Sequence, residues 1–407
     1  MRNKRNSTIA TTIGLIVVLV AGYLMVRDIG LPEGRPLTTL SPRGEKSQSI
    51  QNLIIPVFAI AGLVFVLVEV GLIWLATRFR RDPSDVDGVD EPEQVHGNTK
   101  LEIGWTIFPA VLLAVLAVFN VQTILAMDDA EDPLEVTVIG QQWWWEYRYD
   151  VDANGTVDII TANEAVIPVG RDVVFKIQSN DVIHSFWIPA LAGKLDAVPG
   201  RTHERVLQSN EVGLFQGQCT EYCGLSHGVM RMQVKALETA DYDEWIDRMT
   251  TPPAQPAADD ALAIAGQELF VTQCSFCHQV NGLTPDSKAP FEYAEEPDPD
   301  YGKTVDITLA AGNAPNLTHF MMRDYFAGGL LPLYEEFETD ESTRAKTFDA
   351  YVKAVPDGTP DENNIKAWLR DPEDVKPMNP NNNQGMPNYN LSEEQIEQLT
   401  AFLLTLK

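Results

Sequence analysis

Two long apolar stretches constrain the fold of this chain more than any other feature. Leu53 to Thr77 is apolar except for Glu69 and a few small polar positions, and Ile103 to Met127 is similar, with Trp105 near its start. Each stretch is about long enough to cross the roughly 30 Å hydrocarbon core of a membrane as a helix. We therefore predict a transmembrane helical hairpin over residues 48–130.

Basic residues predict the orientation of the hairpin in the membrane. The polar segment between the two stretches carries Arg78, Arg80, Arg81 and Lys100 beside the membrane ends. Because cytoplasmic loops are enriched in Lys and Arg, this segment is predicted to be cytoplasmic. Everything after Met127 then lies outside the cell membrane, and the chain is a multi-pass plasma-membrane protein that contacts lipid.

The first 30 residues have two interpretations. Three basic residues precede an apolar run from Ile9 to Val26. Such a segment is typical of a secretory signal peptide or of a further transmembrane helix. Both interpretations of residues 1–30 stay open.

Residues 131–250 have the pattern of an all-β domain. Short alternating segments are separated by Gly and Pro turns, which is typical of a Greek-key sandwich or barrel. A Pro/Ala-rich stretch at residues 251–260 follows and predicts an extended, semi-rigid linker. The expected strands are Leu134–Ile139, Trp145–Val151, Asp172–Gln178, Arg201–Leu207 and Gly228–Ala236.

Residues 261–407 change to a helical pattern. Helices are expected over Ala261–Val271, Ile365–Leu369 and Glu393–Leu404, the last capped by Ser392 and opened by two glutamates. The whole chain carries a formal charge of −28, and the part from Thr251 onward holds 26 acidic and only 10 basic residues. This balance argues against a nucleic-acid partner.

One short loop concentrates metal-binding chemistry. Cys219, Cys223, His227 and Met230 lie within twelve residues. Sulfur and imidazole are the ligands that copper prefers, and His184, in an apolar and aromatic segment, supplies a second imidazole. A mononuclear blue-copper site needs only one cysteine, whereas two bridging thiolates between two coppers use every donor. A disulfide between the two cysteines is the plainer alternative.

The other two cysteines belong to a second motif. Cys274, Cys277 and His278 form C-x-x-C-H, the attachment motif of c-type haem, in which the histidine is the proximal iron ligand. Methionine as the distal ligand raises the reduction potential, as suits an electron carrier. Met321, Met322, Met378 and Met386 are the candidates, and Met386 is preferred.

The copper loop resembles that of a known family. His184 with Cys219, Glu221, Cys223, His227 and Met230 resembles the binuclear CuA site of cytochrome c oxidase subunit II. The segments Asn98–Pro109 and Lys194–Arg201 also resemble this family, and the resemblance covers about Gln48–Trp245. It implies a cupredoxin-like β domain after the membrane hairpin.

The resemblance also implies roles for the copper ligands. The two cysteines would bridge the coppers, His184 and His227 would be terminal ligands, and Met230 would be a weak axial ligand. Glu221 would bind copper through its backbone carbonyl. Its carboxylate would reach a magnesium ion shared with subunit I.

Three more residues receive roles from the same resemblance. Trp143, in the aromatic stretch Gln141–Tyr147, would pass electrons to CuA, although packing by amphipathic aromatics is the plainer interpretation. Glu102 would mark the mouth of a proton-uptake channel. The plainer alternative is a solvated acid that the helix dipole favours at a helix N-terminus. Glu69, a charge inside a predicted span, has an open role.

The C-terminal part resembles a class I cytochrome c. Gly385–Glu394 is similar to the Met-Pro loop before the last helix of that family, which favours Met386 over Met378. The whole chain is therefore identified as subunit II of a caa-type haem-copper oxidase. Electrons from an upstream cytochrome or quinol-oxidising complex would reach the haem, then CuA, and then subunit I. There, with subunit III present, O₂ is reduced to water and protons are translocated, the cytochrome-c oxidase reaction.

Three rival functions are weighed against this one. A quinol oxidase subunit II lacks the copper ligands found here. A nitrous oxide reductase-like CuA module lacks the pair of transmembrane helices. A membrane-anchored haem-copper shuttle without an oxidase partner would share every motif of the chain.

Overall fold

The computed structural model describes residues 37–80, 97–155, 157–283, 314–337, 352–382 and 384–407. The described residues form two compact units, one within residues 49–127 and the other made of residues 37–48 and the described part of 128–407. The expectations for residues 1–30 and for Arg81 lie outside the described residues.

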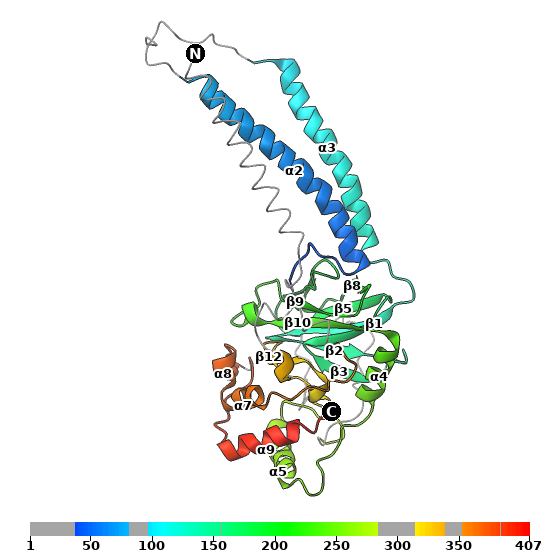
Figure 1. The fold of residues 1–407 in the computed structure, drawn as a ribbon, viewed down its shortest axis with the longest axis vertical. Helices are drawn as coiled ribbons and strands as arrows, with labels where there is room; N and C mark the ends of the chain where they lie inside the picture. Colours follow the sequence, from blue (N-terminus) through cyan, green and yellow to red (C-terminus); the bar gives the residue numbers. More distant parts are fainter. Residues whose placement is uncertain (1–36, 81–96, 156, 284–313, 338–351, 383) are drawn as a thin grey trace. The chain divides into compact units, whose positions relative to one another are not determined.

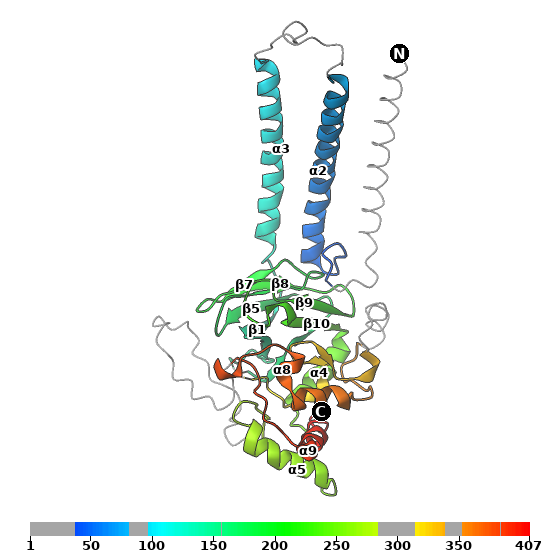
Figure 2. The same ribbon diagram turned by 90° about the vertical axis from the view of Figure 1, so that its left-hand side faces the viewer.

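The first unit contains the two apolar helices. Helix α2 spans Glu45–Arg78 and α3 spans Thr99–Ala126, and both are long and apolar enough to cross a membrane. Figure 2 shows them running in opposite directions. Asn98 caps α3 by accepting a hydrogen bond from the Leu101 amide at 3.2 Å. The helical hairpin is thus present where the apolar stretches predicted it.

The second unit begins with two β-sheets (Figure 1). One has the strand order β3-β2-β1-β5-β8 and the other the order β4-β10-β9, while β6 and β7 form a separate pair. Strand β1 runs antiparallel to β2 and parallel to β5. The bounds are β1 Leu134–Gln141, β2 Trp144–Tyr149, β3 Ile159–Ala162, β4 Glu164–Pro168, β5 Val173–Ser179, β6 His184–Phe186, β7 Leu195–Ala197, β8 His203–Leu207, β9 Gly213–Gln218 and β10 Arg231–Leu237.

Aromatic side chains fill the core of this cupredoxin-like domain. Trp145, Tyr147 and Phe175 are fully buried, and Phe186 from β6 packs on all three. Helix α4 (Thr239–Thr250) closes the domain with Trp245, whose ring lies against Tyr149. The five predicted strands are present within one to three residues. Strands β3, β4, β6, β7 and β9 were not predicted, because they are short or lack clear alternation.

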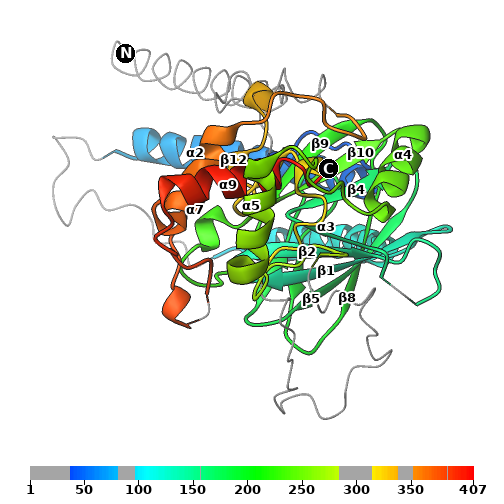
Figure 3. The ribbon, with the colours of Figure 1, turned by 90° about the horizontal axis from the view of Figure 1, so that it is seen from below.

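The C-terminal part is mainly helical in its described residues (Figure 3). Helix α5 packs on α9 where Gly266 allows close approach, since a Cβ there would come within 1.9 Å of the Gln398 carbonyl oxygen. The Ser392 capping box predicted for α9 is present. A short hairpin, β11–β12, was not predicted. The elements are α5 Ala261–Leu269, η2 Phe270–Cys274, η3 Phe320–Met322, β11 Tyr325–Phe326, β12 Leu331–Pro332, η4 Glu335–Phe337, α7 Glu362–Arg370, α8 Pro372–Val375, η5 Pro380–Asn382 and α9 Glu393–Leu403.

A buried ion cluster joins the β domain to the C-terminal part. Lys235 of β10 places its Nζ 3.0 Å from Glu164 of β4 and 2.9 Å from Asp324, which precedes β11. All three side chains are almost fully buried. Burial and the Glu164 charge raise the pKa of Asp324 to about 7. The C-terminal part therefore contacts the β domain directly, in addition to its covalent connection through residues 251–260.

Candidate metal centre and adjoining cavity

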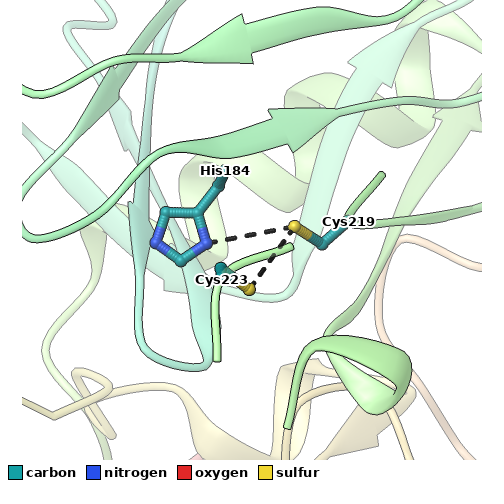
Figure 4. A group of neighbouring side chains, drawn as sticks. All are labelled: His184, Cys219 and Cys223. Carbon is teal, nitrogen blue, oxygen red and sulfur yellow. Dashed lines mark hydrogen bonds between the residues drawn. The ribbon is translucent and has the colours of Figure 1, made fainter. Parts of the chain in front are cut away.

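The loop between β9 and β10 brings the two cysteines together. Cys219 directly follows β9, and the chain turns back at Gly224, whose φ of +113° is a conformation that favours glycine. The Sγ atoms of Cys219 and Cys223 face each other at 3.7 Å, and both thiols are buried and free (Figure 4). The sulfurs are not joined in a disulfide.

Two imidazoles flank the sulfurs. His184, the first residue of β6, directs Nδ1 toward Cys219 Sγ at 3.9 Å (Figure 4). Gly140 of β1 makes room for its ring, because a Cβ there would come within 2.8 Å of the imidazole. His227 places Nδ1 3.7 Å from Cys223 Sγ. Each histidine thus lies next to a different cysteine, which would let each imidazole bind a different copper ion.

The remaining two predicted ligands complete the cluster. Met230, fully buried just before β10, has its Sδ 3.8 Å from Cys223 Sγ. The backbone carbonyl oxygen of Glu221 lies 3.3 Å from Cys219 Sγ, while the Glu221 side chain is exposed. Two thiols, two imidazoles, a thioether and a carbonyl are therefore linked by short pairwise distances, and the ligand atoms of His184, Cys219 and Cys223 all lie within 4.8 Å of one another. This donor set fits copper.

Asp181 supports the cluster and was missed in the sequence. Its Oδ1 lies 2.7 Å from His184 Nε2, so Nε2 carries the proton and Nδ1 is left free to bind a metal. Its Oδ2 accepts a hydrogen bond from the backbone N–H of Gln142 at 2.6 Å. Burial alone lowers the pKa of His184, but the hydrogen bonds to Asp181 and Cys219 outweigh it and raise that pKa. The sequence did hold a signal for this role, because Asp181 lies only three positions before the predicted ligand His184.

The hydrogen bond between the two thiols shifts their pKa values in opposite directions. The hydrogen bond from Cys223 is the largest cause that lowers the pKa of Cys219, to about 3, and His184 adds to the effect. The same hydrogen bond raises the pKa of Cys223. The shifts make Cys219 the more acidic of the two thiols. A metal ion would displace the thiol protons, because thiolates are the binding form.

Trp143 lies directly against this centre. The side chain is buried, and its indole Nε1 donates a hydrogen bond to the Cys223 carbonyl oxygen at 3.0 Å. Gln142 Nε2 donates to the same oxygen at 2.7 Å. Trp145, by contrast, is a core residue that packs edge-on against His184.

A cavity of about 270 Å³ adjoins Trp143. The four predicted haem residues, Cys274, Cys277, His278 and Met386, all line it, and so does Trp143. A helical turn presents the first three, since the His278 amide donates to the Cys274 carbonyl at 2.9 Å. The metal centre and the cavity therefore share Trp143 as a wall.

The cavity offers an imidazole in the form that binds iron. His278 Nδ1 lies 2.9 Å from the Pro315 carbonyl oxygen, which fixes the proton on Nδ1 and leaves Nε2 unprotonated. Burial lowers the pKa of His278 and keeps the ring neutral. Burial also raises the pKa of Cys274 to about 11, so both cysteines of the motif are thiols. These residues fit the haem c that the motif predicts.

Two methionines line the cavity, and their packing differs. Met386 packs against the C-terminal core around Phe270, whereas Met378 packs against the core of the β domain. Met378 also rests on Gly385, where an added Cβ would lie 2.3 Å from its sulfur. Met386 stays the predicted distal ligand.

Comparisons with known proteins identify the family. Residues 38–123 match the family cytochrome c oxidase subunit II, transmembrane domain, and residues 134–237 match cytochrome c oxidase subunit II, periplasmic domain. Cytochrome c oxidase subunit 2 of Alkalihalophilus pseudofirmus is 35% identical over 383 residues, covering 91% of each chain. The chain belongs to the cytochrome c oxidase subunit II family.

Two further relatives of this family were found. Cytochrome c oxidase subunit 2 of Bacillus sp. (strain PS3) is 31% identical, with 97% of this chain and 96% of that protein covered. The crystal structure of the periplasmic domain of subunit II of cytochrome oxidase from Bradyrhizobium japonicum is 29% identical. It covers 30% of this chain and 96% of that chain, with a TM-score of 0.28. Membership in the cytochrome c oxidase subunit II family implies the CuA copper centre and a membrane protein with an extracytoplasmic domain.

The membrane acids of this subunit II lie in the two helices. Glu102, in the first turn of α3, accepts a hydrogen bond from the Asn98 amide at 3.1 Å and so completes the helix cap. This contact accounts for the residue structurally, and a role in proton uptake stays a prediction. Glu69 lies inside α2, and its role stays open.

Proposed function

We propose that this subunit II passes electrons from its own c-type haem, held by Cys274, Cys277 and His278, to CuA. From CuA the electrons continue to subunit I, where O₂ is reduced to water and protons are translocated. The observation that carries the proposal is the position of Trp143. Trp143 lines the cavity of the predicted haem, and its indole donates a hydrogen bond to the carbonyl of a proposed copper ligand, Cys223.

The copper site would be formed by the six residues of the cluster. When bound, the two coppers accept and release one electron at a time. The protein residues hold the donors in place: the β-sheets fix Cys219 and Met230, and Asp181 fixes the ring of His184. A buried site with ligands held this firmly changes little between oxidation states, which favours fast electron transfer.

The haem would be held by residues of the C-terminal part. The thiols of Cys274 and Cys277 would attach it covalently, His278 Nε2 would bind the iron, and Met386 would be the distal ligand. When bound, the haem carries one electron at a time at a potential that the methionine raises. The acidic C-terminal part would receive electrons from an upstream cytochrome or quinol-oxidising complex.

The remaining roles concern the partner subunits. Glu221 is exposed, and its carboxylate would bind a magnesium ion shared with subunit I. Glu102 would mark the cytoplasmic mouth of a proton channel. Subunit III would complete the assembly in the plasma membrane. The whole complex, and not this chain alone, would have cytochrome-c oxidase activity.

A quinol oxidase subunit II is the main rival. A subunit that accepts electrons from quinol needs no copper ligands and no haem motif. Here all six copper donors lie within 3.9 Å of a neighbouring donor, and Cys274, Cys277 and His278 line one cavity. This arrangement favours a haem-to-copper chain over a quinol site.

Rapid reduction of the purified oxidase complex tests the proposal. The haem c is reduced by a short light pulse with a ruthenium donor, and absorbance follows the haem and the copper pair. We expect haem reoxidation and copper reduction at the same rate, and a rate at least tenfold lower in Trp143→Phe. Copper reduction that precedes haem reduction would contradict the proposed order of transfer. Copurification of an O₂-reducing subunit separates an oxidase from a free electron shuttle.

A further inference from the structure

One glutamine of the β domain contacts both the copper loop and the C-terminal part. Gln142 lies half-buried in the turn between β1 and β2. Its Nε2 donates a hydrogen bond to the Cys223 carbonyl oxygen at 2.7 Å, and its Oε1 accepts one from Gln384 Nε2 at 2.8 Å. The side chain of Gln142 thus connects a proposed copper ligand to a residue of the C-terminal part.

The orientation of the Gln142 side-chain amide follows from its two partners. A backbone carbonyl only accepts hydrogen bonds, so Gln142 must present its NH₂ group to Cys223. Its carbonyl oxygen then faces Gln384, which must present an NH₂ group of its own. Both hydrogen bonds therefore run in one direction, from Gln384 through Gln142 to Cys223, and bonds in such a chain polarise one another.

The copper loop makes room for this contact. A Cβ at Gly224 would lie 3.1 Å from Gln142 Nε2 and 3.1 Å from the Trp143 ring, which is tighter than an ordinary contact. The absence of a side chain at Gly224 lets both groups reach the Cys223 carbonyl oxygen. Because this oxygen has two lone pairs, the two donors together satisfy it completely.

The C-terminal end of the chain of hydrogen bonds is also fixed. The backbones of Gln384 and Asn379 exchange two hydrogen bonds, of 2.8 and 3.2 Å. Met386, the predicted distal haem ligand, follows Gln384 by two residues and lines the cavity. The residue that donates to Gln142 therefore belongs to the same segment as the predicted haem ligand.

We propose that Gln142 and Gln384 are positioning residues of the copper centre, through which the C-terminal part raises the reduction potential of CuA. The inference rests on the proposed function, which places copper between Cys219 and Met230 and haem c in the cavity. Hydrogen bonds around a copper-bound cysteine tune the potential of the metal. Donors directed at the carbonyl of this cysteine favour the reduced centre, because they stabilise the additional negative charge.

Reversing the polarity of the chain in the purified oxidase complex tests the proposal. Gln384→Glu keeps the size of the side chain but replaces the donor with a carboxylate. The Gln142 amide would then turn to donate to this carboxylate and lose its bond to Cys223. We expect the reduction equilibrium constant of CuA to fall about tenfold, which is 59 mV for one electron, with both coppers retained. Spectroelectrochemical titration at the copper absorption measures it.

A double-mutant cycle separates the chain of hydrogen bonds from the added charge. Gln384→Leu removes the donor without adding a charge and should lower the constant about threefold, and Gln142→Leu should lower it about fivefold. The backbone N–H of Gln142 still donates to Asp181 in the second variant, so the ligands stay in place. Once Gln142 is Leu, Gln384→Leu should have no further effect, because the two side chains act in series.

Gln267→Leu is the matched control for these variants. Gln267 Nε2 donates to Gln255 Oε1 at 2.7 Å, and neither of these described residues lines the cavity. The pair is therefore of the same chemical kind as Gln384 and Gln142 but does not adjoin the proposed haem. Its loss should leave the copper potential and the electron paramagnetic resonance signal of CuA unchanged.

The outcomes are distinct. An unchanged copper potential in both Gln384→Glu and Gln384→Leu would overturn the proposal, and so would an equal effect of Gln384→Leu with and without Gln142→Leu. If Gln142→Leu does not retain copper, Gln142→Met, which keeps the length of the side chain, takes its place in the cycle. A wild-type complex without a c-type haem signal would refute the proposed function, while the copper potentials would still decide between a connected and an unconnected Gln384.

Discussion

The two cysteine pairs of this chain have opposite environments. Cys219 and Cys223 lie 3.7 Å apart in a loop between β-strands, next to two imidazoles, a thioether and a carbonyl, and the hydrogen bond between them lowers the pKa of Cys219. Cys274 and Cys277 lie on a helical turn at the edge of a cavity, and burial keeps both as thiols. The first environment suits direct binding of metal ions, whereas the second would leave space for the proposed haem and would keep its thiols protonated until they are attached to it.

The same contrast shows in the supporting residues. Asp181 orients His184 by accepting from its ring, while a backbone carbonyl orients His278. A carboxylate increases the electron donation of an imidazole more than a neutral carbonyl does, because it is charged. In each proposed centre a different acceptor therefore sets how strongly the histidine would donate electrons to its metal. Trp143 contacts the copper loop and also lines the cavity.

Loss of one bridging cysteine should produce the largest difference between the two sites in cofactor content. Cys219→Ser removes a thiolate that both coppers need, so we expect the binuclear centre to be lost while haem attachment stays complete. Cys274→Ser should do the reverse, weakening covalent haem attachment with copper unchanged. Copper and haem contents per chain, measured in the purified complex, check both. A single change that removed both cofactors would show that the two sites are not independent.

Loss of the distal haem ligand ranks next. Met386→Leu should remove the sulfur from the iron, alter the haem absorption spectrum and lower the potential, because methionine ligation raises it. Met378→Leu is the matched control, since this residue lines the same cavity but packs against the β domain. If the spectrum changes only in Met378→Leu, the distal assignment is wrong.

The ion cluster between the two parts should contribute strongly to stability. Lys235→Met leaves the carboxylates of Glu164 and Asp324 buried without their ammonium, which should cost about 3–5 kcal/mol. Denaturant unfolding of the full chain measures the loss. Lys176→Met is the control, because its ion pair with Glu135 is at the surface and surface pairs contribute about 0–1 kcal/mol. Equal losses in both variants would contradict a buried cluster.

The smallest effect is expected at Asp181. Asp181→Asn keeps a hydrogen-bond acceptor for His184 but removes the charge, so copper affinity should fall by about 10–100-fold with the site intact. Competition with a copper chelator measures the affinity. Asp132→Asn, an exposed surface change, is the control. An unchanged affinity would mean that the carboxylate does not act on the ligand.

The sequence predicted the parts of this molecule that depend on neighbouring residues. The apolar spans, the capped helix α9 and the copper loop all follow from short-range patterns, and His184 could be added because few histidines exist to choose from. Contacts between distant segments could not be predicted. Lys376 bonds to Trp143 across 233 positions, and Asp324 joins Lys235 and Glu164 from another part of the chain. A single sequence contains no local pattern that indicates which distant residues will be in contact.

The cavity is the clearest example of this limit. The C-x-x-C-H motif predicts a haem, but not that Trp143 of the β domain forms part of its wall. A linker of residues 251–260 suggested a tethered domain, whereas the structure shows direct contacts such as the hydrogen bond from Ser226 to the Pro377 carbonyl. The relation between the two centres is therefore a property of the folded chain.

The central claim is that one chain holds a binuclear copper centre next to a haem site. Electron paramagnetic resonance of the purified complex, combined with copper analysis, tests it most directly. The account predicts two coppers for each haem c, and a signal in which one unpaired electron is shared equally by both copper nuclei. A single copper with a one-nucleus signal, or no copper beside an intact haem, would contradict it.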